Sequence, residues 1–237
     1  MYFDPIYWLV IGVGMVLGLF AQFRVKRTFA KYSQFRTASG LTGADIARHI
    51  LADNGIRDVR VEPVPGDLSD HYDPKAKVLR LSEPVYGSNS MAAFGVAAHE
   101  VGHAIQHAQR YAPLGIRSAW VPVANVGSGL SWLLIMVALS LGGAATAMGA
   151  KVGLLAVMLF ATTTFFTLIT LPVEFDASRR ALVALERGGY VSPNELQGAR
   201  SVLNAAALTY VAAFVTSVLT LLYWAYRLGL FGGRSRD

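Results

Sequence analysis

Residues 152–171 read VGLLAVMLFATTTFFTLITL, a run of 20 residues without a charged side chain. Because an α-helix rises about 1.5 Å per residue, this run makes a helix of about 30 Å, the thickness of the hydrocarbon core of a bilayer. Three further runs are also long and almost free of charge: residues 6–23, 120–141 and 205–226. The sequence therefore predicts an integral membrane protein of mainly α class with four transmembrane helices.

The composition agrees with this prediction. Hydrophobic residues make up 54% of the 237 residues, against about 45–50% in an average soluble domain, and the mean hydropathy is +0.42. Any single run could instead be a buried core helix, and residues 6–23 could be a cleaved signal peptide. Asp4 is the only charge before that first run, and no small-residue cleavage site precedes Arg24, so we expect a retained membrane anchor.

The basic residues predict how the chain crosses the membrane. Of 21 lysines and arginines, 17 fall in residues 24–117 and 174–200. Because positive residues gather on the cytosolic side, we expect these two segments to be cytosolic, a turn at Lys151 to be external, and both termini to lie outside the cell membrane. Three arginines close to the C-terminus count against this orientation: Arg227, Arg234 and Arg236.

The net charge of +6 does not indicate nucleic-acid binding. The basic residues flank the apolar runs and form no patch interleaved with aromatic residues. The chain also has no cysteine, which excludes disulfide bonds and thiolate metal sites.

Residues 24–118 are the segment long enough for a folded cytosolic domain, which a second cytosolic segment, residues 172–204, would complete. The elements expected in the first segment are an amphipathic helix (42–54), a strand (59–62), a turn-rich stretch (63–74), a second strand (78–82) and a helix (90–110). In the second segment we expect a helix over residues 174–187. A capping box at Ser192 and Glu195 then starts the helix of the last span.

Residues 99–103 read HEVGH on one of these predicted helices. The spacing places the imidazoles of His99 and His103 on one face, one turn apart, where both can bind a single zinc ion. Glu100 can act as general base towards a water that the zinc activates. Shuffled chains of this composition would contain the HExxH pattern with a frequency of roughly 0.003. The alternative is a pair of helix histidines that serve only as hydrogen-bonding groups.

Catalytic zinc usually has three protein ligands, so a third is required. His107 continues the series, but it would lie about 12 Å from His99 along an unbroken helix, too far for both to bind one ion. It is a candidate for a supporting or substrate-side role, and ordinary packing on the helix face explains it equally well. Glu174 and Asp176 return to the same side of the membrane after two spans, and Glu174 could equally be a solvated carboxylate at a helix start.

Four stretches of this sequence resemble the YugP-type membrane zinc metallopeptidases: HEVGHAIQH (99–107), LSDHYDP (68–74), LRLSEPVY (79–86) and LPVEFDASRRAL (171–182). The resemblance covers nearly the whole chain, including the order of the spans. It implies a neutral zinc endopeptidase of the glutamate-zincin (gluzincin) kind, distantly similar to HtpX-like and prenyl-protein peptidases, with a small α+β zincin-like catalytic domain. It also implies one zinc ion per chain, with His99, His103 and Glu174 as ligands and Glu100 as the base.

The sequence departs from the wider clan after the third ligand. In the clan pattern two or three residues separate the glutamate from an Ala-Asp pair, and the aspartate of that pair orients a ligand histidine. Here Ser178 occupies that place, and Asp176 is the neighbouring residue able to take the role.

Two features of the expected reaction remain open in the sequence. Side chains of the right type to stabilise an oxyanion are His71, Tyr72, His107, Arg179 and Arg180, and spacing selects none of them. The strand over residues 78–82 is either an ordinary sheet strand or a site where an extended peptide substrate adds by strand pairing.

These observations predict a membrane-embedded zinc endopeptidase that hydrolyses membrane or membrane-proximal proteins. The alternative is a zinc-binding membrane scaffold or adaptor without turnover, although a structural site has no use for a base such as Glu100. A transporter is disfavoured because residues 120–141 and 152–171 carry no charge. Residues 90–110 are too mixed in polarity for a zinc site deep in the bilayer. The substrate, the oligomeric state and any regulatory partner stay open.

Overall fold

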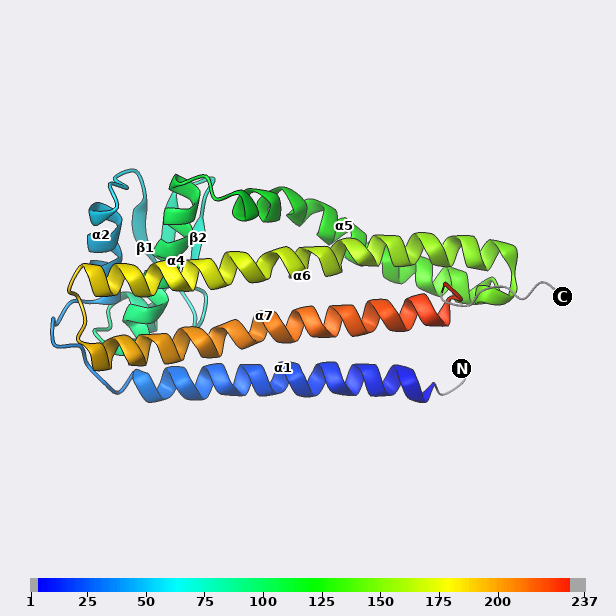
Figure 1. Ribbon diagram of the computed structural model, residues 1–237, viewed down its shortest axis with the longest axis horizontal. Helices are drawn as coiled ribbons and strands as arrows, with labels where there is room; N and C mark the ends of the chain where they lie inside the picture. The colour runs from blue at the N-terminus through cyan, green and yellow to red at the C-terminus, as the bar shows by residue number, and fades with distance from the viewer. Residues whose placement is uncertain (1–3, 231–237) are drawn as a thin grey trace. The chain divides into compact units, whose positions relative to one another are not determined.

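The computed structural model of the chain describes residues 4–230, which group into two compact units. Within the described residues, the first unit comprises the chain up to Leu19, Ile116–Leu171 and the chain from Tyr210 onward. The second unit comprises Phe20–Gly115 and Pro172–Thr209. Most of the chain is helical, with a small sheet in the second unit (Figure 1).

Four helices are long and apolar enough to cross a membrane: α1 (Pro5–Tyr32), α5 (Ala112–Ser140), α6 (Ala147–Arg187) and α7 (Pro193–Arg227). Three of them contain one of the apolar runs completely, and α5 contains the run 120–141 except for its last residue, Leu141. The helices are longer than the runs, and α6 continues through Pro172. A proline inside a helix removes one backbone hydrogen bond, yet α6 runs on to Arg187 and therefore links its apolar run to Glu174 without a loop.

The turn expected at Lys151 lies earlier in the chain. Lys151 is inside α6, and the turn is formed by Gly142 and the short 3-10 helix η1 (Gly143–Ala145). Gly142 and Gly143 have φ values of 94° and 58°, which glycine adopts without a steric penalty, so they end α5. The hydroxyl of Thr146 then accepts a hydrogen bond from the Gly149 amide at 3.0 Å and starts α6. The turn was predicted at Lys151 because a charged residue interrupts the apolar sequence there. The prediction was wrong because glycines, rather than polar residues, make this turn.

The first unit exposes large apolar side chains, as a lipid-facing surface requires. Its exposed residues include Leu9, Val126, Leu133 and Met148. Its interior packs around a cluster that includes Ile135, Ala138, Trp224 and Leu228. Asp4 accepts a hydrogen bond from the Tyr223 hydroxyl at 2.8 Å and pairs with Arg227 at 3.4 Å.

The second unit contains a three-stranded sheet made of β1 (Arg60–Val64), β2 (His71–Asp73) and β3 (Val78–Ser82) in the order β1-β3-β2. Strand β3 is parallel to β1 and antiparallel to β2, with Tyr72 opposite Leu79. The expectation that residues 78–82 could pair with a substrate is wrong, because both edges of β3 are already paired. Strand β2 was missed because three residues between turn formers are too short to show an alternating pattern.

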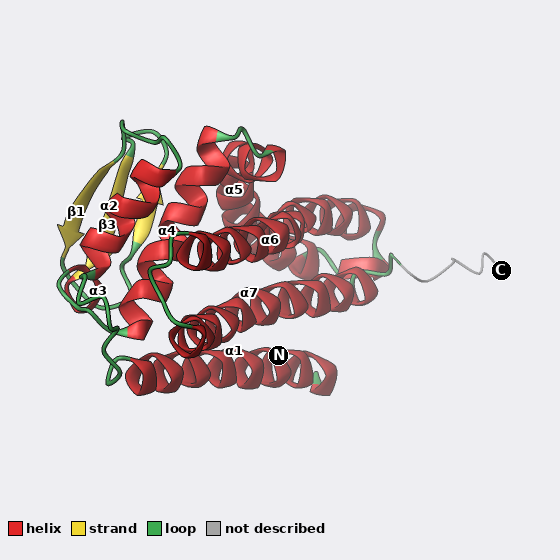
Figure 2. Ribbon diagram, turned by 60° about the vertical axis from the view of Figure 1, so that its left-hand side comes forward, coloured by secondary structure: helices red, strands yellow, loops and turns green. Residues whose placement is uncertain are grey.

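Helices α2 (Gly43–Asp53) and α4 (Met91–Ala108) pack against each other and against this sheet (Figure 2), with the short helix α3 (Glu83–Tyr86) beside them. A side chain caps the start of each helix: the Thr42 hydroxyl accepts from the Asp45 amide and the Ser90 hydroxyl from the Ala93 amide, both at 3.2 Å. Fully buried apolar side chains fill the core between them, including Ile46, Ile50, Leu79, Leu81 and Phe94. This core fixes the position of α4, which carries the HEVGH residues.

Candidate metal centre

His99, His103 and Glu174 converge in the second unit. The two histidines lie one turn apart on α4, with ring centroids 4.8 Å apart, and Glu174 comes from α6. Oε2 of Glu174 lies 3.2 Å from Nε2 of His99 and 3.5 Å from Nε2 of His103. One ligand atom from each residue lies within 4.8 Å of the other two, so the group could hold a metal ion. Two imidazoles and one carboxylate are a donor set that suits zinc and leaves a fourth position for water.

Gly102 lets the two helices come close enough for this convergence. A Cβ atom at Gly102 would lie 2.4 Å from the carbonyl oxygen of Ala177 on α6, well inside van der Waals contact. Glycine inside a helix lowers the stability of the helix by about 1 kcal/mol relative to alanine. The close contact with Ala177 explains why a glycine nevertheless stands between His99 and His103. This role of Gly102 was not predicted from the sequence, although an isolated glycine in a helical pattern is the signal for it.

Gln106 holds the ring of His103 in the orientation that zinc binding needs. The Gln106 amide nitrogen donates to the Val173 carbonyl at 2.8 Å and to Oδ2 of Asp176 at 2.9 Å, so its oxygen Oε1 must face His103. Oε1 lies 3.0 Å from Nδ1 of His103 and accepts a hydrogen bond from its N–H group. The lone pair of His103 is thereby left on Nε2, the atom that faces Glu174. Gln106 is fully buried, and the sequence analysis gave it no role.

Ser178 supports the other histidine. Its hydroxyl lies 3.1 Å from Nδ1 of His99, while Nε2 of His99 faces Glu174. Ser178 therefore contacts one of the two candidate ligand histidines directly, at the place where the clan pattern has aspartate. Asp176, the residue considered for that role, reaches the other histidine, His103, through Gln106.

The two buried carboxylates of the site differ in their electrostatic surroundings. Burial raises the pKa of Glu100 above its ordinary value, against the opposing effect of His99 and His103. Glu100 is 8% exposed, and its carboxylate has no hydrogen-bond partner among the described residues. For Glu174 burial also acts to raise the pKa, but when Nε2 of His103 and of His99 carries a proton, hydrogen bonds from these two rings outweigh burial and hold the pKa well below its usual range. Glu174 is thus kept charged as a ligand should be, and Glu100 is a stronger base than an exposed glutamate.

Comparison with known proteins agrees with this site. Residues 7–229 match a protein family described as "Putative neutral zinc metallopeptidase". The chain belongs to this family. It is also 50% identical over 206 residues to the "Putative membrane protease YugP" of Bacillus subtilis (strain 168), which covers 87% of this chain and 89% of the relative. No solved structure was found to match the chain.

In this member of the zinc metallopeptidase family, the two arginines considered as oxyanion donors are bound elsewhere. Arg179 and Arg180 both donate to the carboxylate of Asp176, and Arg180 also donates to Gln109. Burial acts to raise the pKa of Asp176, but the hydrogen bonds from Arg180, Gln106 and Arg179 outweigh it and lower the pKa. The two arginines therefore hold Asp176 in place, and Asp176 in turn holds Gln106.

The structure joins Tyr72 to His107 at the end of α4. The Tyr72 hydroxyl lies 2.8 Å from Nδ1 of His107, and burial, assisted by the charges of Asp58 and Asp73, raises the pKa of Tyr72 to about 12. Tyr72 therefore keeps its proton at neutral pH and can donate it. As the sequence predicted, His107 is outside the group of possible ligands.

His71, the neighbour of Tyr72 on β2, is exposed. Its Nδ1 lies 2.8 Å from the Ser69 carbonyl, and its Nε2 lies 3.3 Å from Arg80. These contacts belong to the edge of the sheet, and nothing in them connects His71 to the three clustered side chains.

Proposed function

We propose that this protein is a zinc-dependent endopeptidase of the glutamate-zincin kind that hydrolyses peptide bonds of membrane or membrane-proximal proteins. The observation that carries the proposal is the convergence of His99, His103 and Glu174, whose ligand atoms all lie within 4.8 Å of one another. Glu100, buried and next to His99 on the same helix, supplies the base that a peptidase needs and a structural zinc site does not.

The residues of the site suit the steps of peptide hydrolysis. His99, His103 and Glu174 would hold a zinc ion, which would supply a Lewis acid to polarise the substrate carbonyl and to make the attacking water more acidic. Glu100 takes one proton from the water as its oxygen bonds to the carbonyl carbon. Glu100 then gives that proton to the amide nitrogen as the C–N bond breaks, which regenerates the base. The second proton of the water passes from the new carboxyl group to the amine, so the products are a carboxylate and an ammonium. Gln106 and Ser178 keep both imidazole rings aligned throughout.

We place the active site close to the membrane surface. Glu174 follows the apolar run 152–171 by three residues on the same helix, which supports this placement. The charge distribution supports a cytosolic location for a small α+β, zincin-like catalytic domain. For the substrate backbone we assign the outer edge of β2, which is an edge strand of the three-stranded sheet and contacts α4 through Tyr72 and His107.

The test uses the full-length protein in detergent or nanodiscs. We expect Glu100→Gln to retain about one zinc ion per chain while losing cleavage of an unfolded, fluorescently labelled protein, because the ligands are intact and the base is gone. The matched control is Glu186→Gln, an exposed acid on α6, which should cleave like the wild type. Undiminished cleavage by Glu100→Gln would reject the mechanism. A zinc-loaded wild type that cleaves neither this substrate nor a membrane-anchored reporter would favour the scaffold alternative.

A further inference from the structure

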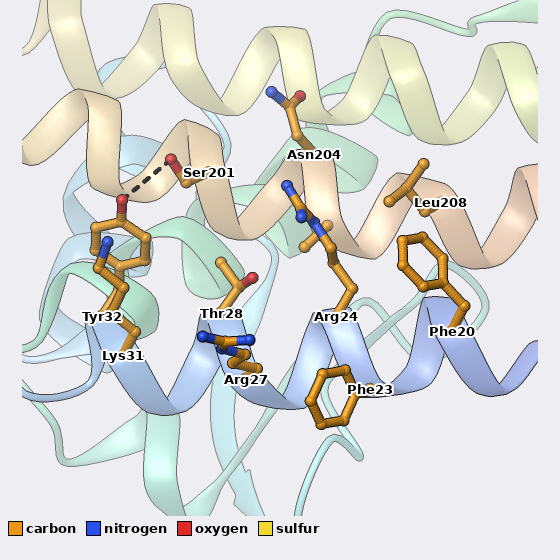
Figure 3. Close-up of a pocket in the computed structure, with 11 residues that line it drawn as sticks. Phe20, Phe23, Arg24, Arg27, Thr28, Lys31, Tyr32, Ser201, Asn204 and Leu208 are labelled. Atoms are coloured by element: carbon orange, nitrogen blue, oxygen red, sulfur yellow. Dashed lines mark hydrogen bonds between the residues drawn. The ribbon is translucent and has the colours of Figure 1, made fainter.

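A cleft of about 790 Å³ lies between the C-terminal half of α1 and the N-terminal half of α7 (Figure 3). All the residues that line it belong to the second unit. At one end the Tyr32 hydroxyl donates to the Ser201 hydroxyl at 3.3 Å and ties the two helices together. At the other end Phe20 of α1 and Leu208 of α7 face each other. The volume is in the usual range of small-molecule sites, about 300–1,000 Å³.

Both walls of the cleft change from apolar to polar at corresponding points. On α1 the apolar run ends at Phe23, and the next lining residues are Arg24 and Arg27. On α7 the apolar run begins at Ala205, directly after Asn204, which also lines the cleft. The cleft is therefore amphipathic along its length, and its polar half starts where each helix leaves its apolar run.

The polar half carries positive charge without compensation. Arg24, Arg27 and Lys31 line the cleft and are exposed, and no acidic residue lines it. Among the described residues none of the three forms an ion pair, although the Lys31 ammonium lies 5.0 Å from the Tyr32 ring centroid. Figure 3 shows Arg24 reaching from α1 towards Asn204 of α7. Three cations on one helix face, i, i+3 and i+7, repel one another unless an anion joins them.

We propose that this cleft binds an anionic phospholipid. The phosphate of the headgroup accepts hydrogen bonds from Arg24 and Arg27, since a guanidinium matches phosphate with two parallel bonds, and from the Asn204 amide. An acyl chain of the same lipid lies along Phe20 and Leu208. A soluble phosphate compound has no apolar part that could occupy this end of the cleft. The proposal is independent of the peptidase function, because no residue of the metal centre lines the cleft.

The general excess of basic residues at cytosolic membrane surfaces does not account for this arrangement. Lys26 is exposed and sits between Arg24 and Arg27 in the sequence, yet it does not line the cleft. If the basic residues act only through their summed charge, Lys26 should matter as much as its neighbours. If the cleft is a site, Lys26 should matter much less.

The experiment measures lipid bound to the full-length protein in neutral detergent, by native mass spectrometry during titration with phosphatidylglycerol or phosphatidylcholine. We expect phosphatidylglycerol to bind more tightly, and Arg24→Gln/Arg27→Gln to weaken it by about fivefold for each cation removed. Lys26→Gln, the matched control, should bind like the wild type. Inorganic phosphate at millimolar concentration should compete poorly.

Several outcomes would overturn the proposal. Equal binding of the two lipids by the wild type would show that the cleft does not recognise the anion, and this arm needs no variant. Equal losses in Lys26→Gln and in the double variant would reduce the effect to surface charge. Efficient displacement by inorganic phosphate would assign the cleft to a soluble phosphate ligand. The folding control has the opposite meaning: unchanged zinc content in the double variant, which the proposal expects, would show that its loss of lipid binding is not a loss of folding.

Discussion

The metal centre and the α1–α7 cleft hold charged side chains in opposite ways. In the centre, Glu174 and Asp176 are 3% and 7% exposed, and each contacts two or more polar partners on the chain itself. In the cleft, Arg24 and Arg27 are exposed and have no ion-pair partner among the described residues. Burying an unpaired charge costs several kcal/mol, so Glu174 and Asp176 can be charged there only because the fold supplies their partners, whereas exposed cations can stay unpaired.

This difference separates two kinds of site. The centre is organised in advance by the packing of α4 on α6, so changes there should affect metal affinity and stability together. The cleft contributes little to folding and depends on a ligand from outside, so changes there should affect ligand binding alone. Variants at each place test this difference.

The largest effect is expected for Glu174→Ala. Losing one of three ligands should lower the affinity for zinc by more than about 100-fold, because removing even a residue that only supports a ligand costs about 10- to 100-fold. Zinc content and competition with a chromophoric chelator measure this, with Glu186→Ala as the exposed control on the same helix. Wild-type zinc affinity in Glu174→Ala would mean that the third ligand is a different residue.

Gln106→Leu should have the next largest effect. The variant keeps the volume of the side chain but leaves the Nδ1 proton of His103 and the carboxylate of Asp176 without their shared partner. We expect a loss of about 10- to 100-fold in zinc affinity. Gln197→Leu, at an exposed position of α7, should leave it unchanged. If both variants bind zinc equally well, the tautomer of His103 is not set by Gln106.

Gly102→Ala tests the close packing that joins the two helices. The new methyl group would lie 2.4 Å from the Ala177 carbonyl, so α4 and α6 must move apart. Overpacking of this kind costs about 1–3 kcal/mol, of which the better helix propensity of alanine offsets about 1 kcal/mol. The expected result is a lower melting temperature and a loss of less than about tenfold in zinc affinity.

Gly115→Ala is the matched control for this prediction. It is a helical glycine of the same unit, in α5, where an added Cβ meets nothing within 4 Å. It should be neutral or should stabilise the protein by up to about 1 kcal/mol. If Gly102→Ala and Gly115→Ala shifted the melting temperature in the same direction by the same amount, the contact between Gly102 and Ala177 would not be the cause of the shift.

Local patterns in the sequence predicted the features that depend on neighbours along the chain. The apolar runs predicted the four long helices, Thr42 and Ser90 predicted helix starts, and the i, i+4 spacing predicted that His99 and His103 share a face. The role of Glu174 could not be predicted in this way. Spacing favoured a metal ligand and a solvated carboxylate equally, and the resemblance to a family favoured the ligand.

Contacts between distant segments were the part that could not be predicted. Gln106 and Asp176 are 70 residues apart, and nothing in either local sequence shows that they meet. Strand β2 is three residues long and is stabilised by pairing with β3, so its own residues carry no strand pattern. The position of β3 between two other strands likewise depends on the sheet as a whole, which is why a peptide site on it was a reasonable expectation and a wrong one.

The smallest effect on the folded protein is expected in the cleft. Because Arg24 and Arg27 are exposed and form no ion pair among the described residues, Arg24→Gln/Arg27→Gln removes no stabilising contact and relieves repulsion between the two cations. We expect the melting temperature in neutral detergent to change by no more than the equivalent of about 0.5 kcal/mol for each substitution, and zinc content to stay the same. Added phosphatidylglycerol should then raise the melting temperature of the wild type more than that of the variant, because a ligand stabilises only the state that binds it. A large loss of stability without lipid would mean that these arginines belong to the folded core of the unit, and the contrast between an internally paired centre and an open cleft would fail.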